Sequence, residues 1–432
     1  MDTTTIVALE IGSSKICGAV GTVDAEGTLT VKIVEEEPLT DSVRYGQPRN
    51  IKVAAASIQR ILRKIQNRLE GRRILSAYVG IGGRSLSSIP TEVERKMPPE
   101  TEITPELLNR LNLEAKSSMN TDKDILAVEP KAFFIDNTRV EKDPEGMYCS
   151  DIKMTASLIV CRKQLKRNID LLVKENVGLG VADYVIRPIA EAELVLTPDE
   201  KRLGCMLVDF GAETTTVAIY RQGRLQYLAT IPIGSRNITR DITTQNCVEE
   251  EAEEIKITRG NAFYSGETTD NVTIPEVEYL VVHRTSEIIA NIKAQIKYAS
   301  LKVEELPGGI VIVGRGAKLS GFSEKLAKET KMKVRTGTTN SSAVRIGDSR
   351  IPSDAVDIIS ILLAGSADPV ECLEPKPQPE IQEPEPAQVP VDEVPRNRDG
   401  NGIGKKIGKW WQGIANALNT EEEGADFSDD DE

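Results

Sequence analysis

The stretch VALEIGSSK at residues 7–15 ends an apolar strand in an acid and then turns through a glycine into a second strand. The same order returns in LVDFGAET at residues 207–214, where Asp209 takes the place of Glu10. A glycine at such a turn permits positive φ and close approach, so consecutive backbone N–H groups can converge on a phosphate oxygen. The acid can hold a water of a Mg²⁺ ion. A single acid-x-glycine turn favours a plain strand connection, so the repeat is what matters.

The elements around the two hairpins repeat as well. Apolar, β-branched runs predict three antiparallel strands at residues 5–9, 18–23 and 29–34, and again at residues 205–209, 215–220 and 224–230. Between the copies, the spacing of apolar residues predicts helices at 52–69 and 164–175 and a strand at 77–81, with Gly178 as a left-handed cap of the second helix. The sequence therefore predicts an α/β chain with a duplicated architecture.

A third motif, GGIVIVGRGAKLSGF, occupies residues 308–322. Its apolar run predicts a buried strand, which a glycine-rich turn joins to a helix that begins near Gly321. Such a turn lets the backbone lie flat against a ribose or a purine, and its free N–H groups can bind phosphate.

Two acidic hairpins and one glycine turn, in this order, resemble the pattern of the actin, Hsp70 and sugar-kinase superfamily. Within that superfamily the chain resembles the FtsA family of bacterial cell-division proteins. The resemblance runs from about Ile6 to Gly365 and resumes at the C-terminal tail. It is carried by residues 7–12, 208–211 and 309–321, by EEIK at 253–256 with GNA at 260–262, by SLIV at 157–160, and by the linker and helix described below.

The resemblance implies an actin-like ATPase fold, in which two ribonuclease-H-like domains flank a nucleotide cleft and carry a small inserted α+β subdomain. On that basis we expect domain I at residues 1–83 and 161–200, with the insert, used for filament contacts, at 84–160. We expect domain II at 201–368 with a small subdomain at about 235–305, a Pro/Glu-rich disordered linker at 369–400, an amphipathic membrane-targeting helix at 401–420 and an acidic tail at 421–432.

The resemblance also implies ATP and Mg²⁺ as ligands. Glu10 and Asp209 would hold hydrated Mg²⁺, and the phosphates would be cradled by Gly12, Ser13, Ser14, Lys15, Gly211, Ala212, Glu213 and Thr214. The nucleoside would be held by Lys256, Gly314, Arg315, Gly316 and Ala317. No residue of the sequence can be assigned to orient an attacking water, so we expect slow hydrolysis at most.

Three positions depart from the family pattern of Gly-Gly-Gly-Thr-x-Asp after the second acid and from its adenosine turn. Thr216 removes a carboxylate, and Glu213 adds one near the expected phosphate position. That added charge disfavours phosphate binding unless Lys15 or Mg²⁺ compensates, or unless Glu213 points to solvent. Arg315 is inserted in the adenosine turn, where it can stack on a purine, meet a phosphate or cover the surface.

The segment GIGKKIGKWWQGIANAL at residues 402–418 is typical of a helix that lies on a membrane. An apolar stripe and a basic side are formed by Ile403, Lys405, Lys406, Ile407, Lys409, Trp410, Trp411, Ile414 and Leu418. The segment is too polar to span a bilayer, and it follows the Pro/Glu-rich tract at 371–395. The alternative is a helix that docks in a protein groove. The acidic residues after it would weaken binding to anionic lipid.

Composition sets the remaining expectations. A net charge of −13 argues against nucleic acid as a partner, and the absence of an N-terminal signal predicts a cytoplasmic protein. The six cysteines show no CxxC spacing, which predicts reduced and mostly buried thiols, and His283 is the only histidine. A Ser-His-Asp site, a Cys-His site or a His-based zinc site is therefore not expected.

Together these features, with the resemblance, predict a peripheral protein of the cytoplasmic face of the inner membrane at the division site. It would self-assemble, bind anionic lipid, anchor the tubulin-like FtsZ ring through the FtsZ C-terminal tail peptide, and recruit later division proteins. Two alternatives stay open: an ATP-dependent kinase or ATPase of the same superfamily, and a nucleotide-poor scaffold like the type IV pilus assembly proteins.

Overall fold

A six-stranded sheet is built around the first predicted meander, and this sheet with the helices packed on it forms the first half of the structure. The computed structural model describes residues 3–375 apart from residues 120, 141–143, 264–272 and 340–341. Within the sheet, β1, β2 and β3 are antiparallel neighbours, β6 and β11 continue it in parallel beside β1, and β17 pairs in parallel with β3. The bounds are β1 (Thr4–Ile11), β2 (Lys15–Val23), β3 (Leu29–Pro38), β6 (Ser76–Ile81), β11 (Gly180–Ile186) and β17 (Val344–Ile346).

The second sheet repeats this arrangement. Its strands β12, β13 and β14 form an antiparallel meander, and β15 and β16 continue it in parallel beside β12. The order β14-β13-β12-β15-β16 therefore matches β3-β2-β1-β6-β11 in both neighbours and directions. The predicted duplication is confirmed. The bounds are β12 (Cys205–Phe210), β13 (Thr215–Arg221), β14 (Arg224–Ile231), β15 (Ile310–Val313) and β16 (Val334–Thr336).

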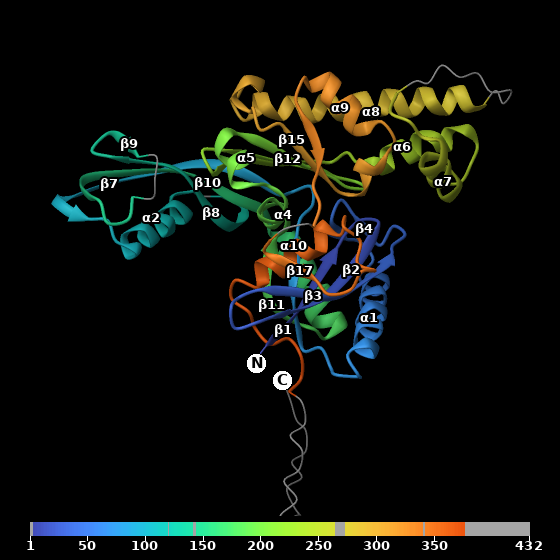
Figure 1. Ribbon diagram of the computed structural model, residues 1–432, viewed down its shortest axis with the longest axis horizontal. Helices are drawn as coiled ribbons and strands as arrows, with labels where there is room; N and C mark the ends of the chain where they lie inside the picture. The colour runs from blue at the N-terminus through green and yellow to red at the C-terminus, as the bar shows by residue number, and fades with distance from the viewer. Residues whose placement is uncertain (1–2, 120, 141–143, 264–272, 340–341, 376–432) are drawn as a thin grey trace, which may run out of the picture. The chain divides into compact units, whose positions relative to one another are not determined.

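A third group of strands interrupts the first half in sequence but extends the sheet of the second half. β7 pairs with β14 where Ser87 lies opposite Ala229, and the Leu228 amide donates to the Ser88 hydroxyl at 2.9 Å. β10, β8 and β9 follow β7 in antiparallel order, and α2 packs against β7, β8 and β10 (Figure 1). The bounds are β7 (Ser87–Glu102), α2 (Pro105–Ser118), β8 (Lys123–Ile135), β9 (Thr138–Val140) and β10 (Tyr148–Arg162).

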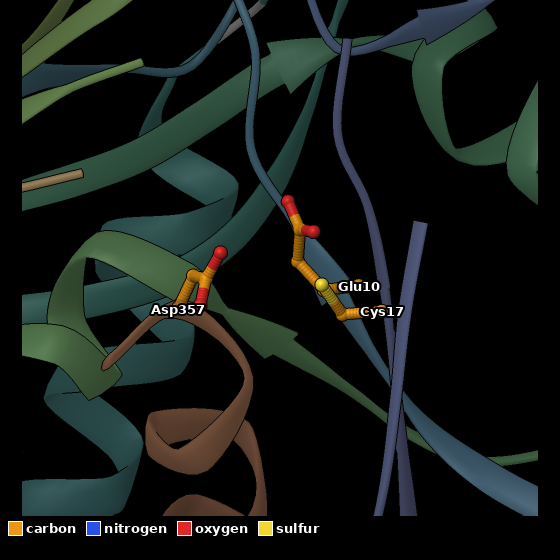
Figure 2. A group of neighbouring side chains, drawn as sticks. All are labelled: Glu10, Cys17 and Asp357. Carbon is orange, nitrogen blue, oxygen red and sulfur yellow. The ribbon is translucent and has the colours of Figure 1, made fainter. Parts of the chain in front are cut away.

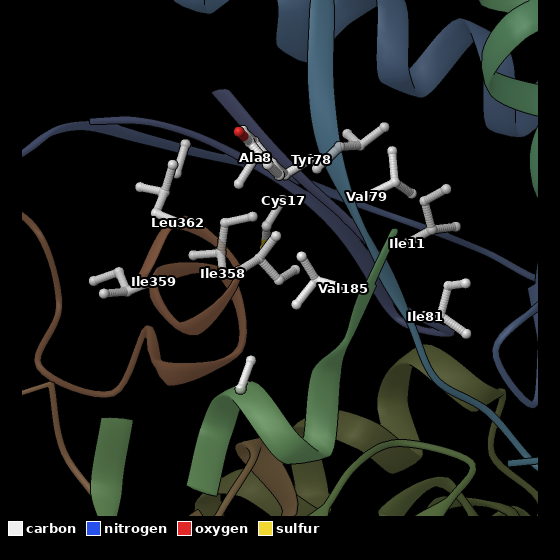
Figure 3. Packing of buried hydrophobic residues seen from close by; sticks show 14 of the residues in the cluster. Ala8, Ile11, Cys17, Tyr78, Val79, Ile81, Val185, Ile358, Ile359 and Leu362 are labelled. Atoms are coloured by element: carbon white, nitrogen blue, oxygen red, sulfur yellow. The ribbon is translucent and has the colours of Figure 1, made fainter. Parts of the chain in front are cut away.

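Helices cover both faces of the first sheet. Asn50 caps α1 (Ile51–Arg68) by accepting a hydrogen bond from the Val53 amide. A Cβ at Gly18 would lie 2.6 Å from the Ile61 side chain, so β2 and α1 pack closely. Side chains alternate along a strand, and the neighbouring Cys17 faces Ile358 of α10 (Val356–Gly365) on the opposite side (Figure 3).

The remaining helices include the predicted segment after β10. It is an α-helix, α3 (Lys163–Asp170), that continues as a π-helical segment (Leu171–Val177) and ends at Gly178 with a φ of 74°. The left-handed cap is confirmed. The other bounds are β4 (Val43–Arg44), β5 (Gln47–Pro48), α4 (Arg187–Val195), α5 (Pro198–Leu203), α6 (Ser235–Ile242), α7 (Glu249–Arg259), α8 (Thr273–Tyr298) and α9 (Phe322–Thr330), with 3₁₀ segments Thr243–Gln245, Val303–Glu305 and Arg315–Lys318.

The chain returns to the first half near its end, which corrects the boundary expected at residue 368. β17 pairs with β3, and α10 packs against β1, β6 and α4. The reason is the apolar surface of α10, whose Ile358 and Leu362 are fully buried against the first sheet.

The linker expected from residue 369 also begins too early. Cys372 and Leu373 are buried, and the Cys372 amide donates to the Thr5 carbonyl oxygen at 2.9 Å. The rest of the linker, the helix at 401–420 and the acidic tail lie outside the described residues.

The sequence predicted reduced cysteines, and it predicted a C-terminal segment that is too polar to span a membrane. All six cysteines are free, and each is buried except Cys247, which is half-buried. Among the helices in the described part of the chain, none combines the length and the apolar character that crossing a bilayer requires.

Candidate functional site

Two hairpins of matching geometry end the first strand of each meander. In one, Gly12 donates its amide to the Lys15 carbonyl oxygen at 3.0 Å, and in the other Gly211 donates to the Thr214 carbonyl oxygen at 2.9 Å. A Cβ at Gly12 would lie 2.9 Å from the Lys15 oxygen, and one at Gly211 would lie 3.0 Å from the Thr214 oxygen. Both turns therefore need glycine for space.

The glycine turn after β15 lies directly against the second acid. Gly314 has a φ of 86°, and a Cβ there would lie 2.6 Å from an Asp209 carboxylate oxygen. β15 runs parallel to β12 with Val313 opposite Asp209, so this contact follows from the sheet register. The glycine turn that begins at Gly314 therefore packs directly against the hairpin that begins at Asp209.

These motifs line two adjoining cavities. The narrow one, of about 70 Å³, and a larger one, of about 830 Å³, share Ser14, Lys15, Ala212 and Arg315. The larger volume lies in the range of small-molecule sites, roughly 300–1,000 Å³. Of the residues predicted to hold phosphates and nucleoside, the narrow cavity is lined by Gly12, Ser13, Ser14, Lys15, Gly211, Ala212, Glu213, Thr214, Gly314 and Arg315, and the larger one by Lys256 and Gly316 in addition to the shared residues.

One predicted residue does not face these cavities. Ala317 packs against the hydrophobic core of the second half. The larger cavity instead has apolar side chains on its walls, which suit a flat ring such as a purine. They are Pro38, Leu39, Ile238, Ile257 and Leu319.

Glu10 and Asp209 are both buried, and an arginine that the sequence did not single out lies with them. Arg187, at the start of α4, lies 2.8 Å from an Asp209 carboxylate oxygen and 2.8 Å from a Glu191 oxygen. Burial alone would lower the pKa of Arg187, but the Asp209 and Glu191 carboxylates outweigh it and raise the pKa. Arg187 therefore stays charged and links the two halves at the floor of the cleft.

A second unexpected acid, Asp357, completes the charge cluster from α10. It pairs with Lys15 at 3.0 Å, and its carboxylate, that of Glu10 and the Cys17 sulfur all lie within 4.8 Å of one another (Figure 2). Burial, followed by the proximity of Asp357, raises the pKa of Glu10 to about 7. Burial raises the pKa of the Cys17 thiol as well, which keeps it protonated and unsuited to hard cations.

The cluster fits a hydrated divalent cation. One Glu10 carboxylate oxygen is buried and has no hydrogen-bond partner among the described residues. Two cations, Lys15 and Arg187, face four carboxylates, and burial raises the pKa of two of these, Glu10 and Glu191, so a bound divalent cation would favour their ionised forms. Carboxylate oxygens and bound waters are the ligands that Mg²⁺ prefers.

Glu213 does not point to solvent, which excludes one interpretation of the sequence. Its side chain is 1% exposed, and it contacts Arg44, Arg236 and Arg240. These arginines, and not Lys15 or Mg²⁺, compensate its charge. The Glu213 carboxylate is thus held by cations of this chain.

Lys256 and Arg315 are engaged with acids at the edge of the larger cavity. The buried Lys256 ammonium donates to Glu253 at 2.7 Å and to the Thr239 hydroxyl at 3.0 Å. Burial lowers its pKa despite Glu253. Arg315 reaches across from the second half to Glu36 of β3 at 2.5 Å, and its side chain is half exposed.

Sequence reasoning missed Arg187, Glu191 and Asp357. Asp357 is the one charged residue of the apolar helix α10, which is a usable signal of a buried site, whereas Glu191 shares α4 with Arg187 and Glu193 and does not stand out. Arg187 precedes Pro188 at a helix start and has no signal of its own.

Comparisons with known proteins give the family of this chain. A family model described as "Cell division protein FtsA" matches residues 206–355, and one described as "SHS2 domain inserted in FTSA" matches residues 83–160. The cell division protein FtsA of Porphyromonas gingivalis is 31% identical over 340 residues, which cover 75% of this chain and 71% of the relative. That of Pseudomonas aeruginosa is 31% identical over 354 residues, covering 77% and 82%. The chain belongs to the FtsA family of cell-division proteins.

The solved structures agree on the fold of this FtsA-family chain. The PilM-PilN type IV pilus biogenesis complex superposes with a TM-score of 0.57 at 16% identity, over 84% of this chain and 96% of that one. The fold is actin-like, duplicated and mixed α/β, with the SHS2 domain inserted in the first half.

Proposed function

We propose that this cell-division protein binds ATP with Mg²⁺ in the cleft between its two halves. The observation that carries the proposal is the pair of matching glycine hairpins, which line one narrow cavity next to a cavity of about 830 Å³. Amides in such turns suit phosphate oxygens, and the apolar walls beyond them suit a nucleoside.

The roles of the residues follow from their places. The turns at residues 12–15 and 211–214 would cradle the phosphates, with Lys15 as a charged partner. Glu10 and Asp209 would hold waters of Mg²⁺, which when bound would neutralise phosphate charge. The turn at residues 314–316, which packs closely on Phe210, and Lys256 would border the nucleoside.

Bound ATP would act mainly as a conformational ligand. Arg187 with Asp209 and Arg315 with Glu36 already cross between the halves, so a ligand that bridges both hairpins favours their closed arrangement. No described residue is assigned here to orient an attacking water, and we propose slow hydrolysis at most. Closure would then shift self-assembly into filaments or oligomers.

We further propose that the protein works on the cytoplasmic face of the inner membrane at the division site. Family membership and the basic Trp-containing stripe at residues 402–418 support this. The stripe would bind anionic lipid, and the globular part would bind the C-terminal tail peptide of the tubulin-like FtsZ protein and recruit later division proteins.

The nucleotide part is tested by calorimetric titration of Mg-ATP into the full chain and into Asp209→Asn. The amide keeps a hydrogen-bond acceptor for Arg187 but removes the charge that would hold Mg²⁺, so we expect affinity to fall at least about tenfold. Asp199→Asn is the matched control, since Asp199 is an exposed acid on α5. Equal affinity in all three proteins would refute the role of Asp209.

A further inference from the structure

Glu213 lies where the two halves meet, and its four contacts come from both of them. From the second half, Arg240 of α6 lies 2.9 Å and Arg236 3.4 Å from one carboxylate oxygen. From the first half, Arg44 lies 2.8 Å from the same oxygen, and the Tyr45 amide donates to the other oxygen at 2.7 Å. The Glu213 carboxylate is therefore held from both sides of the cleft by groups of the protein itself.

The second half is built to present the two arginines. The Ser235 and Arg236 amides, at the start of α6, donate to the carbonyl oxygens of Gly211 and Ala212 at 3.0 and 2.7 Å. α6 is therefore fastened to the second phosphate hairpin. Positions 236 and 240 are one helical turn apart, so both arginines lie on the side of α6 that faces Glu213.

The first half contributes a small arm, the hairpin of β4 and β5 at residues 43–48. Its two-residue turn has positive φ at both positions, 53° at Tyr45 and 73° at Gly46. Positive φ is unfavourable for a tyrosine, yet it turns the Tyr45 amide toward Glu213. The backbone thus adopts a costly conformation at the point where it meets the other half.

The same arm is fastened to the first phosphate hairpin. The Gly46 amide donates to the Ser13 hydroxyl at 2.9 Å, and the Arg84 amide donates to the Tyr45 carbonyl oxygen at 3.1 Å. Gly46 also packs closely on Gly83: a Cβ at Gly46 would lie 2.7 Å from the Gly83 Cα. The arm is therefore held by hairpin 12–15 and by the start of the insert.

We propose that Glu213 is a positioning residue that clasps the two phosphate hairpins together through the arm at residues 43–48. A buried carboxylate is costly unless cations and hydrogen bonds surround it, and here they come from opposite sides of the cleft. Separation of the halves would leave the charge without Arg44 and Tyr45. The clasp sets the spacing of the hairpins before any nucleotide binds, so it does not rest on the proposed function.

Hydrogen exchange of the full chain without nucleotide tests the clasp. The readout is the peptide that contains the Tyr45 amide, which is protected only while Glu213 accepts its hydrogen bond. Arg44→Gln removes the partner from the first half and is expected to speed exchange there at least tenfold. Arg44→Lys keeps the charge and is expected to restore much of the protection.

Two matched controls separate the clasp from general loosening. Arg236→Gln removes a cation from the same half as Glu213, and Arg63→Gln removes an exposed arginine of α1. Both are expected to leave the exchange of Tyr45 within about twofold of the native chain. Unchanged exchange in Arg44→Gln, or equal acceleration in Arg236→Gln, would overturn the proposal.

A double-mutant cycle in urea gives a second measurement that does not depend on hydrogen exchange. Arg44→Gln and Glu213→Gln are combined, and the unfolding equilibrium constants are compared with those of the single variants. We expect non-additivity of at least fivefold. Additive effects would overturn the clasp, because residues that do not interact across the cleft behave independently.

Discussion

Arg187, from the first half of the chain, forms a 2.8 Å ion pair with Asp209, which stands near the end of the first strand of the second half. The pair is buried, and Glu191 holds the other side of the guanidinium. The acid that the sequence points to as a Mg²⁺ partner is thus also a structural joint between the halves. Mg²⁺ binding at Asp209, as proposed above, would therefore be coupled to movement of the halves through this one side chain.

The apolar wall of the larger cavity predicts how the nucleoside contributes to binding. Ile257 is 72% exposed on α7, although a large apolar residue there gains nothing from facing water. Ile257→Ser should weaken ATP binding about fivefold, equivalent to roughly 1 kcal/mol of lost apolar contact. Inorganic triphosphate should bind equally well to both proteins, as measured by calorimetry.

Val248→Ser is the control for that substitution. Val248 is an exposed apolar residue just before α7, and it does not line the cavity. Loss of ATP affinity in Val248→Ser, or none in Ile257→Ser, would place the nucleoside elsewhere.

α10 should matter for stability as a core element of the first half. Ile358 is fully buried and faces Cys17 of β2 (Figure 3). Ile358→Ala should lower the free energy of unfolding by about 2–5 kcal/mol in urea, since the cavity cannot close completely. Val370→Ala removes methyl groups at a 48% exposed site and should change it by less than about 0.5 kcal/mol. Similar values for the two variants would contradict the packing.

The segment after α10 should act as part of the fold. Cys372 accepts a hydrogen bond from the Leu75 amide at 2.8 Å, and Glu371 accepts one from the Thr5 amide at 2.8 Å. A version that ends at residue 368 loses these bonds and the burial of Leu373, so its stability should fall by roughly 3 kcal/mol. A version that ends at residue 376 should unfold like the full chain. An equal loss of stability in the two shortened versions would show that residues 369–376 do not stabilise the fold.

One pH dependence follows from Glu200 on α5. Burial alone would raise the pKa of its carboxyl, but hydrogen bonds from Arg335 and Thr197 outweigh it and lower the pKa below 4.5. The stabilisation is therefore fully present above about pH 4.5 and is lost as the pH falls through the folded-state pKa. It is on the order of 1 kcal/mol or less, because Arg335 is well exposed.

Urea unfolding of the native chain and Glu200→Gln from pH 7 to pH 3 measures this contribution. The difference in stability should shrink as the pH falls below about 4.5. Glu304→Gln, at an exposed acid, is the control. A difference that stays constant over the whole range would show that ionisation of Glu200 contributes nothing.

Strands and hairpins were predictable from the sequence because their signals are local. The run at residues 7–12 shows its apolar strand, its acid and its glycine together, and the copy at 208–211 shows them again. The left-handed helix cap at Gly178 was predictable for the same reason, because a glycine directly after a helical pattern is a local signal.

What the sequence did not show depends on contacts between distant segments. Arg187, Asp357 and Arg44 reach the cleft from three separate elements, and no spacing rule connects them. The return of α10 to the first half was missed because its apolar run suits either core. The sequence suggested that Glu213 would repel phosphate, because its three arginines lie 23, 27 and 169 positions away, two on α6 and one on β4, beyond the reach of local patterns.

Sedimentation with anionic liposomes measures whether this protein binds a membrane surface and whether nucleotide strengthens that binding. The full chain and a version that ends at Gly400 are compared with and without Mg-ATP. We expect the full chain alone to sediment with the liposomes, and Mg-ATP to strengthen its binding. Equal sedimentation of both versions would show that residues 402–418 do not bind the membrane and would assign them to a protein partner.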